Sequence, residues 1–143
     1  MKNLKPFKNA KKMMLIAIIL PCLYSTFVLS FVWWHCYTSA FNGGGNGQLD
    51  AYRHTFASAV VSYTLSLKLV SLISLVMENK NGAGNLMDKH NNIIGAQIGS
   101  KSQSLTELNT LVIIQTQGGR ANASSPTQVT WLPAKYWAKR LFW

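Results

Sequence analysis

The sequence contains few acidic residues. Asp and Glu together number 4 among 143 residues, against 14 Lys and Arg, and the formal net charge is +10. This excess favours association with phosphate-bearing partners, either anionic lipid or nucleic acid, and says nothing about the fold. Cysteine is also scarce, and the positions of Cys22 and Cys36 exclude a disulfide framework or a zinc box built from cysteines. We interpret both as small apolar residues near a membrane.

A long uncharged segment near the N-terminus gives the clearest signal. Met13 to Trp34 is 22 residues without a charge, and five lysines precede it: Lys2, Lys5, Lys8, Lys11 and Lys12. At about 1.5 Å per residue, this segment is long enough to cross a hydrocarbon core of roughly 30 Å. The sequence therefore predicts a transmembrane or signal-anchor helix within residues 1–35.

The flanking residues predict how this helix is oriented. The lysines place its start in the cytoplasm, and Trp33 and Trp34 suit an aromatic belt at the far side of an inner membrane. The rest of the chain is then expected to face the periplasm or the exterior. Thr38-Ser39-Ala40 leaves secretion after signal cleavage as an alternative. We favour a retained anchor, because the apolar region is longer than is usual for cleavage.

The remainder predicts one small all-α domain. Residues 36–47 include the run Asn-Gly-Gly-Gly-Asn-Gly, which is typical of a flexible linker, and residues 48–143 leave room for a helical domain. Asp50 is expected as an N-cap or first-turn acid of a helix whose apolar residues recur every three or four positions as far as Met77. We expect two core helices here, with a break near Ser66 to Leu69. The alternative is a second membrane span from Thr55 to Met77, which the charge of Lys68 disfavours.

Further helices are expected downstream. Leu86 to Gln103 reads as a helix, whereas Thr106 to Gln115 is too short for periodicity to distinguish helix from strand. Pro133 suits the first turn of an amphipathic, aromatic C-terminal helix. That helix either lies on anionic lipid or closes the domain core. Nucleic acid is not an expected partner of a domain outside the cytoplasm, whereas a protein partner in the envelope is.

The candidate site combines scarce acids with histidine and amide side chains. Its members are Arg53, His54, Glu78, Asp88, His90, Asn91 and Asn92. On a helix, Asp88 and either Asn91 or Asn92 share one side, which can face His54 and Glu78. His54, Glu78 and Asp88 are then the candidate ligands of one divalent metal ion. Equally, His54 is a candidate general base that Glu78 or Asp88 orients. Arg53 then contacts a phosphate or an oxyanion, and the amides and His90 position the substrate.

A structural interpretation of the same residues stays open. Arg53 would pair with Asp50 or Asp88, a carboxylate would cap His54, and the asparagines would bond to backbone carbonyls. His90-Asn91-Asn92 also suggests an HNH-type nuclease, but the preceding residues Asn81 to Asn85 do not resemble the hairpin that such sites need.

These residues resemble a known bacterial domain of unknown function. Asp50-Ala51-Tyr52-Arg53-His54, the later Glu78 and the block from Met87 to Gly95 are similar to its pattern D-A-x-R-H, then E, then M-D-x-x-N-N-x-x-G. The likeness covers residues 48 to 103. Members of this family occur alone and at the ends of secreted toxin-like proteins, so the resemblance implies a small helical domain outside the cytoplasm, with hydrolysis as the expected activity. This chain has Met77 where the pattern has a histidine, which removes one candidate ligand.

Two hypotheses for function follow. The first is a membrane-anchored hydrolase, toxin-like and acting on an envelope substrate such as phospholipid or a cell-wall precursor. The second is a non-enzymatic membrane protein, such as an immunity protein, a holin-like protein or an assembly factor, in which the polar cluster is structural.

Overall fold

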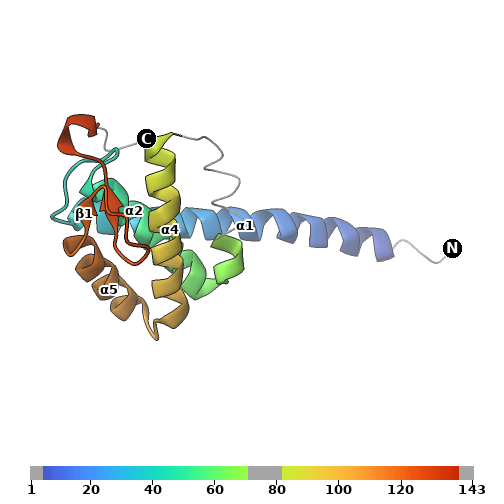
Figure 1. Cartoon of the computed structure of the whole chain (residues 1–143). Helices are drawn as coiled ribbons and strands as arrows, with labels where there is room; N and C mark the ends of the chain where they lie inside the picture. Colours follow the sequence, from blue (N-terminus) through green and yellow to red (C-terminus); the bar gives the residue numbers. More distant parts are fainter. Residues whose placement is uncertain (1–4, 71–81, 139–143) are drawn as a thin grey trace.

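The computed structural model describes residues 5–70 and 82–138, and within these ranges the fold is helical, as predicted (Figure 1). The only sheet in that part of the chain is a parallel pair of two-residue strands. In chain order, the elements are α1 (Lys5–Thr38), α2 (Gln48–Thr64), α4 (Ala83–Lys101), α5 (Leu105–Gln117), β1 (Arg120–Ala121), β2 (Thr130–Trp131) and a 3-10 turn (Ala134–Tyr136).

Helix α1 is long and apolar enough to cross a membrane or to act as a signal sequence. The most apolar 18 residues of its Ala10–Thr38 part have a mean hydropathy of 2.3, and only 6% of those residues are buried. Pro21 lies inside the helix without ending it, as expected for a segment that can re-satisfy a lost backbone bond in a membrane. The described part of the chain contains no second helix of this kind. Figure 1 shows the N-terminal part of α1 projecting beyond the rest of the fold.

The last turns of α1 belong to the core. Val32 and Cys36 are each 4% exposed and pack in the same cluster as residues of α2. Phe31 stacks on Phe56 with ring centroids 5.6 Å apart, and the hydroxyl of Tyr24 hydrogen-bonds that of Thr64 at 2.7 Å. Because α1 positions fall as α2 positions rise, the two helices run antiparallel.

The glycine-rich segment before α2 is folded against the domain, which differs from the flexible linker that its composition predicts. Gly43 has φ +79°, and a Cβ there would lie 2.8 Å from the ring of Trp137. Gly45 pairs with Ala138 in an antiparallel bridge. Such contacts require glycine, since a side chain would fill the space that Trp137 occupies. The division into residues 1–35, 36–47 and 48–143 stays a prediction.

Helices α2 and α4 form the centre of the domain and run in the same direction. Three contacts join residues that are 34 apart in sequence: His54 with Asp88, Ser58 with Asn92, and Ser62 with the carbonyl of Ala96. The approach is close because α4 presents glycines to α2. A Cβ on Gly95 would lie 2.0 Å from the carbonyl oxygen of Thr55, and one on Gly99 would lie 2.1 Å from that of Ala59. This is a small-residue packing of the G-x-x-x-G type.

The expected break after the first core helix is present. Helix α2 ends at Thr64, Leu65 leaves helical geometry, and residues 67–70 are helical again. A straight span from Thr55 to Met77 is therefore interrupted after its tenth residue, although its last part lies outside the described residues.

Downstream, the ambiguous segment is the helix α5, and Ser104 caps it by accepting a hydrogen bond from the Glu107 N–H at 3.1 Å. The expected C-terminal helix is absent from the described residues that follow Pro133. They form one 3-10 turn, after which Trp137 is extended and Ala138 joins the bridge to Gly45. The indole N–H of Trp137 donates to the carbonyl of Leu132 at 2.6 Å. This aromatic side chain therefore packs against the fold and does not lie on the face of a helix.

Candidate functional site

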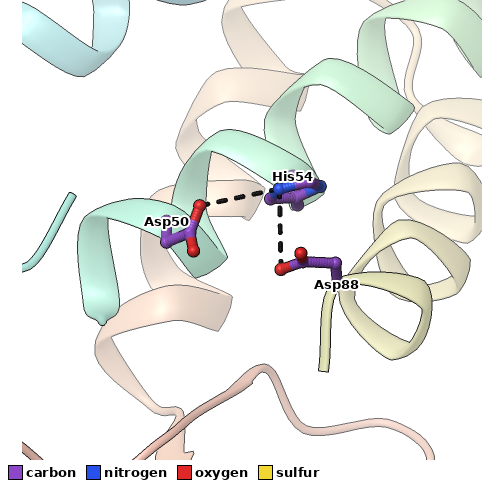
Figure 2. A group of neighbouring side chains, drawn as sticks. All are labelled: Asp50, His54 and Asp88. Carbon is purple, nitrogen blue, oxygen red and sulfur yellow. Dashed lines mark ion pairs between the residues drawn. The ribbon is translucent and has the colours of Figure 1, made fainter. Parts of the chain in front are cut away.

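The first turns of α2 and α4 bring two carboxylates to one imidazole (Figure 2). Asp50 and His54 are four residues apart on α2, so both lie on one face of that helix. Asp88 reaches the same ring from α4. The Nε2 atom of His54 lies 3.5 Å from Asp50 Oδ1 and 3.5 Å from Asp88 Oδ1. Figure 2 shows both carboxylates directed at the same edge of the ring.

Asp50 is the anchored member of this group. The Arg53 guanidinium pairs with its Oδ1, and the backbone N–H of Asn46 donates to its Oδ2 at 2.5 Å. Arg53 also donates to the carbonyl of Gly44 at 3.3 Å and stacks over the ring of Trp33, 5.6 Å from its centroid. These contacts fix the start of α2 against the end of α1, and they account for the folded glycine-rich segment.

The group is recessed yet accessible. The side chain of His54 is 26% exposed and that of Asp88 is 16% exposed, whereas that of Asp50 is only 6% exposed. Burial lowers the pKa of His54, and the charge of Arg53 acts in the same direction. The charge of Asp50 and a hydrogen bond with Asn92 oppose that shift in pKa. His54 is therefore neutral at neutral pH, the form that serves as a base or as a metal ligand.

The spacing of these atoms suits a metal ion. One ligand atom from each of Asp50, His54 and Asp88 lies within 4.8 Å of the others. Donor atoms about 2.1 Å from a tetrahedral metal ion lie about 3.4 Å from one another. The two distances of 3.5 Å at Nε2 match that value. With Arg53 counted, the four side chains carry one net negative charge while His54 is neutral, in a chain whose overall charge is +10.

The structure separates the predicted amides into two groups. Asn92 faces the cluster, and its Oδ1 accepts a hydrogen bond from Ser58 at 2.8 Å. Asn91 turns the other way, to β2: its amide donates to the carbonyl of Thr130 at 2.8 Å and accepts from the Thr130 N–H at 3.0 Å. This fully buried side chain completes the hydrogen bonding of a strand, and its expected role in positioning a substrate stays a prediction.

His90 also lies away from the cluster. Its Nε2 is 2.9 Å from the carbonyl oxygen of Gln128, and its expected role in substrate positioning stays a prediction. On this side His90 lines a pocket of about 230 Å³ together with Met87 and Trp131. His54 is not among the residues that line it.

One predicted ligand cannot be placed, and one acid that was not predicted as a ligand joins the group. Glu78 lies outside the described residues, so its place in the site stays a prediction. Asp50, which the sequence predicts only as a helix-start acid and a partner of Arg53, supplies the second carboxylate at His54. Its spacing of four residues from His54 was the available signal. Comparison with protein-family models, curated proteins and solved structures found no match for this chain.

Proposed function

We propose that the chain is a membrane-anchored hydrolase acting on an envelope substrate, either phospholipid or a cell-wall precursor. The observation that carries this proposal is the convergence of Asp50 Oδ1 and Asp88 Oδ1 on one accessible, neutral imidazole at 3.5 Å. A divalent metal ion such as Zn²⁺ or Mn²⁺ would take Asp50, His54 and Asp88 as ligands and supply an activated water.

The residues around the group have roles in this proposal. Arg53 holds Asp50 in place, and its charge would suit the phosphate of an anionic substrate that reaches this largely buried side chain. Asn92, fixed by Ser58, orients the imidazole through the hydrogen bond that also raises its pKa. The resemblance to a family found in secreted toxin-like proteins supports an activity outside the cytoplasm.

Metal binding is the first test, and it uses the full chain in detergent micelles, since α1 contributes Val32 and Cys36 to the core. We expect one divalent ion per chain by elemental analysis and a higher Tm with added metal; at 100 times Kd, the stabilisation is about 2.7 kcal/mol. His54→Ala should abolish both effects. His90→Ala is the matched control, because it removes a histidine of the same domain that lies outside the cluster, and it should bind metal as the wild type does.

Activity is the second test. Vesicles of phosphatidylglycerol and a lipid-linked cell-wall precursor serve as substrates, with metal-loaded wild type, His54→Ala and His90→Ala compared. Product formation that His54→Ala loses and His90→Ala retains is the expected result. A folded His54→Ala protein that keeps full hydrolysis would contradict the proposal.

A second candidate, a non-enzymatic membrane protein with a structural polar cluster, is favoured by one observation. Arg53 and the Asn46 N–H already satisfy both oxygens of Asp50. For such a protein, His54→Ala and Asp88→Ala lower stability by roughly 1–3 kcal/mol each through lost buried partners. Neither variant then changes metal content, because none is bound by the wild type.

A further inference from the structure

The part of α1 that stands clear of the domain is shorter than a bilayer. Every side chain from Ala10 to Leu23 is exposed, and within residues 5–70 and 82–138 the first hydrogen bond from α1 to the domain is that of Tyr24 with Thr64. Met13 to Leu23 spans about 16 Å as a helix, and even Ala10 to Leu23 spans only about 21 Å. A hydrocarbon core is about 30 Å thick. If α1 spans the membrane, its outer half must cross beside the domain.

The end of α2 is the part of the domain that lies there. Thr64 is joined to Tyr24, and Phe56 stacks on Phe31 farther out. In Figure 1, the green turn after α2 is next to the projecting part of α1. We infer that this tip, defined as residues 63–67, is inserted in the non-cytoplasmic leaflet of the bilayer alongside α1.

The side chains of the tip suit lipid. Tyr63 is 37% exposed, Leu65 51% and Leu67 43%. Exposed leucines on a turn that leaves helical geometry are costly in water and favourable in acyl chains. Lys68 follows on the same turn and is exposed. At the depth of the tip this charge opposes insertion, so the apolar side chains of the tip must outweigh it.

This depth also fixes the level of the candidate site. Tyr24 lies about 16 Å beyond Met13, and His54 is ten residues before Thr64 on the antiparallel α2, about 15 Å farther out. The site is then about 31 Å from the level of Met13, at the outer edge of a core of about 30 Å. The stacking of Arg53 on Trp33 places it independently at the same level, because Trp33 is also about 30 Å from Met13 along α1. The cluster therefore opens among lipid headgroups, which would supply a hydrolase with substrate from its own leaflet.

Thiol accessibility in vesicles tests the insertion and needs no catalytic activity. The full chain is reconstituted in sealed phosphatidylglycerol–phosphatidylethanolamine vesicles with a membrane-impermeant maleimide on both sides. Wild type provides the background, since Cys36 is buried and Cys22 is exposed only to lipid if α1 is inserted. Leu65→Cys probes the tip. Tyr136→Cys is the matched control: Tyr136 is 55% exposed, and its carbonyl accepts a hydrogen bond from Asn46, at the opposite end of α2.

We expect Leu65→Cys to react at least about tenfold more slowly than Tyr136→Cys, because a thiol among acyl chains does not form the reactive thiolate. Denaturation in SDS should expose every thiol and show that each variant carries the expected number. Leu67→Cys repeats the probe should Leu65→Cys fail to reconstitute. Equal labelling of the tip and Tyr136→Cys overturns the inference, and so does labelling of wild-type Cys22. A loss of hydrolysis with a protected tip would contradict the proposed enzyme and leave the insertion standing.

Discussion

Replacing Gly95 with alanine tests the packing that assembles the site. The new Cβ would lie 2.0 Å from the backbone carbonyl oxygen of Thr55, whereas ordinary contact begins at 3.4 Å, so α2 and α4 must separate by about 1.4 Å. Overpacking of this kind costs about 1–3 kcal/mol, and backbone on both sides cannot move aside as a flexible side chain would. Alanine's higher helix propensity recovers up to about 1 kcal/mol. We expect a net loss of stability.

Gly118→Ala is the matched control, and it should have the opposite sign. Gly118 is the C-cap of α5 with φ −80°, and the nearest atom to a Cβ there is 3.5 Å away. Alanine fits without strain and restricts the unfolded chain, which stabilises by about 0.4–1 kcal/mol. Thermal unfolding followed by circular dichroism in detergent measures both. A change of 1 kcal/mol moves the Tm of a domain this size by roughly 4–8 °C.

The two variants also differ at the site. Separation of α2 from α4 lengthens the pair between His54 and Asp88, so Gly95→Ala should weaken metal binding as well as lower the Tm. Gly118→Ala should neither weaken metal binding nor lower the Tm. A Gly95→Ala protein that melts at or above the wild-type Tm would refute the close packing of these helices.

Two further predictions concern single side chains. Because the pKa of His54 is lowered from 6.5, the unfolded chain binds a proton at a higher pH than the folded chain. The free energy of unfolding should therefore fall as the pH drops from above 6.5 to the lowered pKa and then level off. Urea titrations of wild type and His54→Gln across that range isolate the effect. The free energy of unfolding of wild type minus that of His54→Gln should fall as the pH drops, and a rise would contradict the lowered pKa. Asn91→Ala should lower the free energy of unfolding by about 1–3 kcal/mol for each Thr130 group left without its partner, while metal content is unchanged. Loss of metal from a folded Asn91→Ala protein would return this residue to the site.

Helices α1, α2 and α4 and their approximate limits could be predicted from the sequence, because they depend on local patterns, whereas the residues of α5 were left open between helix and strand. The long uncharged segment predicted α1, and the spacing of apolar residues predicted the core helices. Runs of glycine and asparagine indicated the connections. A break was predicted near Ser66 to Leu69, because one straight helix would carry His54 about 36 Å from Glu78, and α2 ends slightly earlier, at Thr64. The prediction of a C-terminal helix was wrong for the described residues. The pattern of Trp137 and Ala138 is equally satisfied by an indole that bonds to Leu132 beside a bridge from Ala138 to Gly45.

The candidate site was only half predictable. His54 and Asp88 were named from residue chemistry, and the helical spacing of Asp88 and Asn92 placed them on one face. Which residue of α2 each of these side chains contacts depends on the register of α2 against α4. The sequence of one helix does not determine how it is aligned against another. Gly95 sets that register through contact with the Thr55 carbonyl, which turns Asn92 to the site and Asn91 to β2.

The sequence by itself determined that this chain carries an apolar membrane-length helix and a polar cluster within a helical domain, since composition and local periodicity act along the chain. Only the tertiary structure decided that Asp50 joins His54 and Asp88, and that the end of α1 belongs to the domain core. Both depend on close approach of segments distant in sequence, where the absence of a Cβ or the stacking of two rings sets the distance.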